Sequence, residues 1–234
     1  MDARTLWGAT LLLGALLVVT TNIAFGFLPS GPPDVARGYG GTIYAVEFAP
    51  MMGDVRAALG WVPDAPDPEV VRQLTRGLLF DFAYLLHYSL FMALFCLAAL
   101  RSGGPGWLRI GIALAVLAGA MDAVENHLLL EAVAKIDAVT ATEPIYAALF
   151  ARVKFAAIAG TLGVAGLYML RLCGALRWLG GAALLAALAV VPGILFPSRL
   201  GFVLGNAIGV GWLAMLVCAF QQWRTLRAPR GLPA

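Results

Sequence analysis

One short polar stretch holds the residues of this chain whose types and spacing can do chemistry. It places the side chains of Asp122, Glu125, Asn126 and His127 inside an apolar run from Leu108 to Leu130. The first three lie at i, i+3 and i+4 and therefore share one face of a helix. His127 is rotated from Asp122 by about 140° and is expected to point elsewhere. Ionisable groups inside such a run are costly to bury, so we expect them to have a partner or a task.

Two carboxylates on one helix face can divide the roles of proton donor and proton acceptor. A cation beside one of them keeps it ionised, and the other, buried without a cation, can hold a proton. Asp122 and Glu125 are therefore candidate catalytic residues. His87 is the candidate second base, with Asp81 as the residue that orients it. Lys154 is expected to hold one carboxylate ionised and to be able to bind an anionic head group.

The composition indicates an integral membrane protein. Of the 234 residues, 61% are hydrophobic and 12% are charged, whereas soluble domains carry about 25% charged residues. The mean hydropathy is +0.86. A formal net charge of +3 is too small to favour nucleic acid as a partner. We expect a plasma membrane, of bacterial type, as the location.

Apolar segments long enough to cross a bilayer predict an all-α bundle of six transmembrane helices in a single domain. The segments are Leu6–Leu28, Leu78–Leu100, Trp107–Val133, Ala147–Leu170, Leu176–Phe196 and Leu200–Gln221.

The distribution of basic residues predicts that both termini are cytoplasmic. On that assignment the opposite short loops carry only Lys135 and Arg199, in agreement with the positive-inside rule. The cytoplasmic side receives Arg4, Arg101, Arg109, Arg171, Arg177, Arg224, Arg227 and Arg230.

The segment from Pro29 to Gly77 is then an extracytoplasmic insertion between the first two helices. Within it, Thr42–Leu59 mixes apolar and charged residues, and Pro50 is expected to break this stretch into two short helices that lie on the bundle or at the membrane interface. Asp67 before Pro68 is typical of a helix start, so the second helix is expected to begin outside the membrane.

Polar residues that are far apart in the sequence are expected to lie at a similar depth in the membrane. At about 1.5 Å per residue, Asp122 lies about 8 Å, Lys154 about 10 Å and His87 about 13 Å below the outer face. This level predicts a site that opens to the extracytoplasmic side. Its candidate ligand-binding residues are Asp81, Tyr84, Tyr88, Asn126, Arg152, Lys154, Asn22 and Asn206.

Two interpretations of this cluster remain open. In the first, the site binds or acts on a lipid or another amphipathic molecule. In the second, the carboxylates of Asp81, Asp122 and Glu125 and the cations of Arg152 and Lys154 form an ionic lock between helices. The protein is then an accessory subunit of a larger membrane complex. A transporter is disfavoured, because the inner half of the bundle lacks polar groups that could continue a pathway.

Other chemistries have little support in the sequence. No P-loop, HExxH or Rossmann fingerprint is present, so no metal site is predicted and the cofactor stays unassigned. Gly201, Gly205 and Gly209 form one small-residue face, which is typical of close helix packing. We expect packing within the chain there, with a homo-oligomer or another membrane subunit as the alternative.

The predicted orientation can be tested by labelling. With Lys135 or Asp64 replaced by cysteine, a membrane-impermeant thiol reagent added to intact cells is expected to label the new residue, because both positions lie outside. Labelling from the cytoplasm alone contradicts this orientation.

Overall fold

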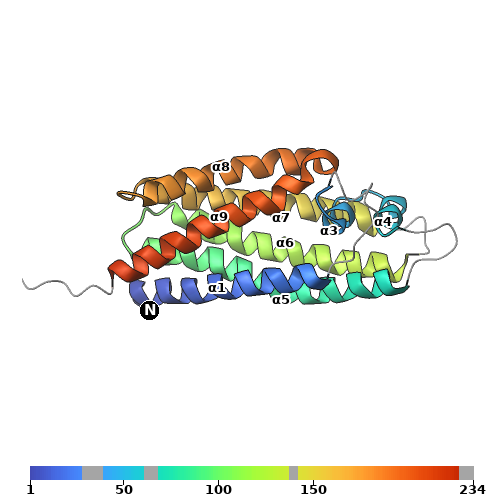
Figure 1. The fold of residues 1–234 in the computed structure, drawn as a ribbon, viewed down its shortest axis with the longest axis horizontal. Helices are drawn as coiled ribbons and strands as arrows, with labels where there is room; N and C mark the ends of the chain where they lie inside the picture. The colour runs from blue at the N-terminus through green and yellow to red at the C-terminus, as the bar shows by residue number, and fades with distance from the viewer. Residues whose placement is uncertain (28–38, 61–67, 137–141, 227–234) are drawn as a thin grey trace, which may run out of the picture.

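The computed structural model describes residues 1–27, 39–60, 68–136 and 142–226, and this part of the chain consists of helices and the turns that join them. The all-α prediction is confirmed for these residues. Six helices are long, and two short ones, α3 (Thr42–Glu47) and α4 (Met52–Ala58), lie at one end of the bundle (Figure 1). The long helices are α1 (Ala3–Phe27), α5 (Pro68–Arg101), α6 (Leu108–Ala134), α7 (Glu143–Leu170), α8 (Leu176–Leu195) and α9 (Pro197–Thr225).

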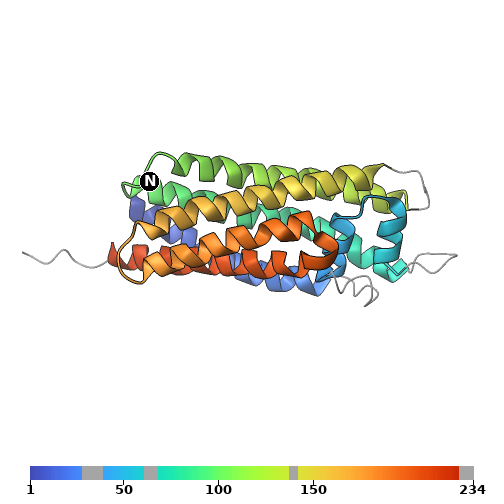
Figure 2. The same cartoon turned by 90° about the horizontal axis from the view of Figure 1, so that it is seen from above.

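The long helices form a ring in which neighbours in sequence are neighbours in space. Each of α5, α6, α7, α8 and α9 packs closely on the long helix before it. α1 and α9 close the ring with a much smaller contact than any of these pairs. The start of α1 and the end of α9 lie at the end of the bundle opposite to α3 and α4 (Figures 1 and 2).

Within the described residues, five helices are long and apolar enough to cross a membrane, which indicates a membrane protein. They are α1, α5, α7, α8 and α9. α6 has a comparable length of 27 residues but is not among them. It carries the polar stretch that contains Asp122, Glu125 and Asn126.

The predicted helix boundaries at prolines are found in the structure. Pro50 falls between α3 and α4, as expected for the stretch Thr42–Leu59, and α5 begins at Pro68 and continues without interruption to Arg101. Asp67, the expected cap of this helix, lies outside the described residues. α7 begins at Glu143, followed by Pro144 in its first turn, where the missing proline N–H is not needed.

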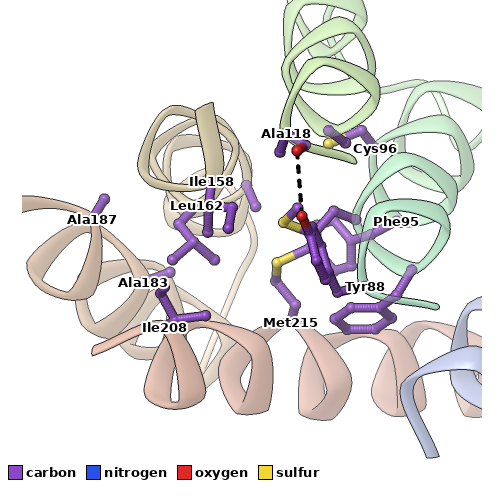
Figure 3. Packing of buried hydrophobic residues seen from close by; sticks show 14 of the residues in the cluster. Tyr88, Phe95, Cys96, Ala118, Ile158, Leu162, Ala183, Ala187, Ile208 and Met215 are labelled. Carbon is purple, nitrogen blue, oxygen red and sulfur yellow. Dashed lines mark hydrogen bonds between the residues drawn. The ribbon is translucent and has the colours of Figure 1, made fainter. Parts of the chain in front are cut away.

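The central core lies between the long helices. Figure 3 shows the Tyr88 side chain extending from α5 toward the backbone carbonyl of Ala118 on α6, beside Phe95, Cys96 and Met215. The Tyr88 hydroxyl oxygen lies 3.3 Å from that carbonyl oxygen. Aromatic side chains of α5 thus fill the centre of the ring and hold a polar group at the α5–α6 contact.

A second, smaller core fixes the two short helices. Val46 of α3 and Val55 of α4 are fully buried against the ends of α5, α6 and α7. Arg56 donates a hydrogen bond from Nε to the carbonyl oxygen of Ile136, just beyond α6, at 2.8 Å. The short helices are therefore packed on the bundle, so that a side chain of α3 can have a defined position inside it.

The predicted glycine face packs largely within the chain. A Cβ atom on Gly201 would lie 2.5 Å from the Tyr39 carbonyl oxygen, and one on Gly205 would lie 2.8 Å from the Tyr44 hydroxyl oxygen. Gly40 has a φ of +80°, and a Cβ there would lie 2.3 Å from Phe202 Cα. These glycines let the segment that leads into α3 lie directly on α9.

The close packing of α8 on α7 can be tested at two adjacent glycines of α8. A Cβ on Gly180 would lie 2.6 Å from the Leu170 backbone nitrogen, whereas a Cβ on Gly181 meets nothing within 4 Å. Gly180→Ala is expected to separate the helices and to lower the free energy of unfolding by about 1–3 kcal/mol. The matched change Gly181→Ala should leave the melting temperature unchanged or raise it. Equal melting temperatures for the two variants would contradict this packing.

Candidate functional site

A buried lysine is the centre of the polar cluster. Lys154 of α7 is 4% exposed. Its Nζ atom lies 3.1 Å from Glu47 Oε1, 3.0 Å from Asp122 Oδ1 and 2.8 Å from Glu125 Oε2. One ammonium group therefore faces three carboxyl groups from α3 and α6, and all three of these side chains are also buried.

Helix geometry explains how these groups meet. Asp122 and Glu125 lie one turn apart on the face of α6 that packs on α7, so both reach the same ammonium group. His127, on the opposite side of α6, has a 68% exposed side chain and pairs with Glu131. The predicted division of this stretch into an inner and an outer face is confirmed. The third carboxylate, Glu47, ends α3 and is brought in by the packing of the short helices.

The ammonium group of Lys154 is closely surrounded by its partners. It donates hydrogen bonds to Glu47 and Asp122. The Glu125 carboxylate and the Phe155 ring, whose centroid is 4.7 Å from Nζ, cover it further. A lysine ammonium has three donors, and these contacts surround them. The expectation that Lys154 binds an anionic head group stays a prediction, and these contacts do not favour it.

Two further hydrogen bonds join α5 to the polar face of α6. The Tyr88 hydroxyl lies 2.7 Å from Asp122 Oδ2, which places a donor on the second oxygen of that carboxylate. Asn126 donates from Nδ2 to Asp81 Oδ2 at 2.7 Å. The second bond differs from the predicted pairing, in which Asp81 orients His87. Asp81 is instead tied to the helix that carries Asp122 and Glu125.

Some buried polar atoms of the cluster are left without a hydrogen bond. Among the described residues, Glu47 Oε2, Glu125 Oε1 and the indole nitrogen of Trp212 have no hydrogen-bond partner. Burial raises the pKa of the Glu47 carboxyl above its ordinary value, and the neighbouring Lys154 ammonium opposes this rise. Buried groups of this kind normally have partners, and the Glu47 and Glu125 carboxyl groups lie within hydrogen-bond reach of each other.

A cavity of about 300 Å³ adjoins the cluster. It lies between α1, α5 and α9, with α3 at one end and α7 behind it. Glu47, Asp81, Asp122 and Lys154 are its charged lining residues. The other residues that line it are Gly14, Leu17, Val18, Thr21, Asn22, Ile43, Tyr44, Gly77, Leu78, Tyr84, Tyr88, Phe91, Phe155, Ile158, Gly205, Ile208, Gly209, Trp212, Leu213 and Leu216.

The mouth of the cavity lies between α1 and α9. Val18 of α1 is 53% exposed and Leu213 of α9 is 60% exposed, and both line the cavity. Gly209 lines it too, and a Cβ added there meets nothing within 4 Å. The opening therefore lies at the sparsest helix contact of the ring, on its apolar outer side.

Aromatic rings form one wall of the cavity. Tyr88 and Trp212 are stacked, with ring centroids 5.7 Å apart and an interplanar angle of 21°. Tyr84 meets both of them edge-on, at 5.7 Å from Tyr88 and 6.3 Å from Trp212. The sequence predicted Tyr84 and Tyr88 as ligand-binding residues on one stripe with Asp81, and all three line the cavity. Trp212 completes this wall from α9.

Other predicted site residues lie elsewhere. His87 is partly buried, its Nδ1 has no hydrogen-bond partner among the described residues, and it does not line the cavity. Arg152 donates to the carbonyl oxygen of Ala148 at 2.7 Å and lies over the Phe48 ring, 5.4 Å from its centroid. The cluster therefore has the cation of Lys154 but neither His87 nor Arg152.

The two predicted asparagines are exposed. Asn22 lines the cavity at its outer rim but donates to the Val18 carbonyl oxygen of its own helix at 2.7 Å. Asn206 likewise donates to the Phe202 carbonyl oxygen at 2.8 Å and is not a lining residue. Both side-chain amides therefore donate to carbonyl oxygens of their own helices, α1 and α9, and do not reach the carboxylates.

Sequence reasoning missed Glu47 and Tyr44. It placed their segment on the bundle or at the membrane interface and assigned neither residue to the site. A signal was present, because Glu47 is preceded by Ala45 and Val46 and followed by Phe48, all apolar. Glu47 closes an otherwise apolar helix, and its burial brings a third carboxylate to the ammonium group.

No metal centre is apparent in the part of the chain that the structure describes, since no group of His, Cys, Asp and Glu side chains there has a metal-binding arrangement. Comparison of the chain with protein-family models, with curated proteins and with solved structures found no match. The functional interpretation therefore depends on the geometry of the cluster and of the cavity.

The pairing of Lys154 with the carboxylates can be tested by thermal unfolding of the purified protein. Lys154→Met is expected to lower the free energy of unfolding by about 3–5 kcal/mol, because it leaves three buried carboxyl groups without their cation. Adding Glu47→Gln, Asp122→Asn and Glu125→Gln should recover much of that loss, because no buried charge then remains at the cluster. A wild-type melting temperature for Lys154→Met alone would contradict the role of this lysine.

Proposed function

We propose that this is an integral membrane protein with six membrane-spanning helices, whose cavity binds a lipid or another amphipathic molecule. The observation that carries the proposal is the cavity itself, which joins an apolar mouth to an interior with three carboxyl groups. An amphipathic molecule has the same two parts. Its apolar part fits between α1 and α9, and its polar part reaches the carboxyl groups.

Packing supports a membrane position for α6. This helix lies between α5 and α7 and contacts both along the ring. Its polar residues Asp122, Glu125 and Asn126 are at most 2% exposed. Because these groups are enclosed by protein, they do not meet the hydrocarbon, and a helix that carries them can span a bilayer.

Charge at the two ends of the bundle supports cytoplasmic termini. The residues Arg4, Arg101, Arg109, Arg171, Arg177 and Arg224 all lie at or next to helix ends on the side of the chain termini. The opposite end carries acidic residues as well, among them Asp54, Glu131 and Glu143. Under the positive-inside rule, α3 and α4 are then extracytoplasmic, and the cavity lies in the outer half of the bundle.

The geometry favours binding over catalysis. Asp122 is held by Lys154 and Tyr88, and Glu125 does not line the cavity. Neither predicted catalytic carboxylate is therefore free to exchange a proton with a molecule in the cavity.

The alternative, an accessory subunit with an internal ionic lock, is favoured by one observation. The ammonium group of Lys154 is enclosed by three carboxyl groups, as a lock requires. A lock does not need a cavity, however, and the unpaired Glu47 oxygen adds nothing to it. We assign the lock to Lys154 and binding to the adjoining space.

Filling the cavity tests the proposed function. Gly209→Leu places a side chain in the open space at the mouth, and it is expected to reduce the co-purified amphipathic molecules detected by mass spectrometry at least severalfold. The melting temperature should stay the same or rise, because leucine favours a helix over glycine by about 0.8 kcal/mol.

Gly181→Leu on α8 is the matched control, because a Cβ there also meets open space but lies away from the cavity. It should retain the wild-type set of bound molecules. Equal retention by the Gly209→Leu and Gly181→Leu variants would contradict binding in this cavity.

A further inference from the structure

We propose that the molecule that binds in this cavity is an amphipathic organic cation, such as one with a quaternary ammonium head. The inference rests on the proposed function and names the chemical class of its ligand. It follows from the charge of the lining, from the partly exposed carboxylate of Asp81 and from the aromatic wall.

The lining carries more negative than positive groups. Glu47, Asp81 and Asp122 line the cavity, and Lys154 is the only basic residue among the described lining residues. The Lys154 ammonium also faces Glu125 from behind the lining. Since that ammonium is enclosed by its partners, it offers nothing to an anion. A bound cation adds the positive charge that these carboxyl groups lack.

Asp81 directs the inference to a specific place. It lines the cavity, its side chain is partly exposed, and it accepts a hydrogen bond from Asn126. Glu47 lines the cavity too, but its Oε1 accepts a hydrogen bond from Lys154 and its Oε2 is fully buried. Next to α3, the cavity therefore presents a carboxylate of α5 that a cation can approach.

Aromatic faces suit an organic cation better than a metal ion. A quaternary ammonium group is attracted to the faces of Trp and Tyr rings at about 6 Å or less from the centroid. Tyr84 and Trp212, both partly exposed, supply such rings to the lining, with the buried Tyr88 ring stacked on Trp212, and Tyr44 of α3 lies on Gly205. A small inorganic cation would instead need several oxygen ligands around one point, an arrangement absent among the described residues.

The apolar mouth accounts for the remainder of the ligand. Leu17 and Val18 of α1 and Leu213 and Leu216 of α9 line the side away from the charges. A cavity of about 300 Å³ is at the small end of ligand sites. It accommodates the head group and the first part of a hydrocarbon chain, while the rest of the chain extends outward between α1 and α9.

The experiment compares three chains of equal length. The full-length protein in nanodiscs of zwitterionic lipid is titrated with dodecyltrimethylammonium, with its neutral isostere that carries a tert-butyl group, and with dodecanoate. Empty nanodiscs correct for partition into the lipid. We expect the cation to bind at least about tenfold more tightly than the neutral isostere, and the anion not to bind above the background.

Two variants locate the effect. Asp81→Asn removes a charge from the lining while keeping its shape, and Trp212→Leu removes a ring from the wall. Each should lower the affinity for the cation severalfold and leave the weak affinity for the neutral isostere unchanged. Glu131→Gln, a change of an exposed carboxylate outside the cavity, is the matched control and should bind as the wild type does.

The outcomes separate this inference from the proposed function. Equal or tighter binding of the neutral isostere or of dodecanoate overturns the cation assignment and leaves an amphipathic site in place. An unchanged cation affinity in both Asp81→Asn and Trp212→Leu, with wild-type melting temperatures, also overturns the assignment. Binding of none of the three probes above the empty-nanodisc background overturns the proposed function as well.

Discussion

The contact between the Lys154 ammonium group and three carboxyl groups is the constraint on which the rest of the arrangement depends. A buried charge is tolerated only when its partners are close, and these partners come from α3 and α6. The contact therefore fixes the register of α6 against α7 and holds α3 over the end of the bundle. The position of α3 in turn closes one end of the cavity with Tyr44 and Glu47.

Charge also explains why the cluster and the cavity are different parts of one site. The Tyr88 hydroxyl and the Lys154 ammonium both donate to Asp122, so the hydrogen bonds on the Asp122 side are made within the protein. Asp81 and Glu47 line the cavity instead. The completed side stabilises helix packing, and the incomplete side is available to a molecule from outside. An arrangement of this kind allows binding to vary without loss of the fold.

The sequence was most informative where a helix face decides the outcome. The spacing of Asp122, Glu125 and Asn126 predicted their common burial and the exposure of His127, because 3.6 residues per turn leave no other arrangement. The pairing of Asp122 or Glu125 with Lys154 followed from their similar depth. Depth alone misassigned Arg152, because a long side chain can turn to its own backbone and to the Phe48 ring. Glu47 was missed because its place depends on tertiary packing of a six-residue helix, which no periodicity encodes.

The ring order of the helices has a consequence for how the protein forms. From α5 onward, each long helix packs on the one made just before it, so these contacts are local in sequence and can arise during synthesis. The joint between α1 and α9 brings together the two ends of the chain and can close only after the last helix is made. The cavity mouth lies at this joint. The last contact to form is thus also the smallest between neighbouring helices of the finished ring. A folding intermediate that lacks this contact is already open at the place where a ligand would enter.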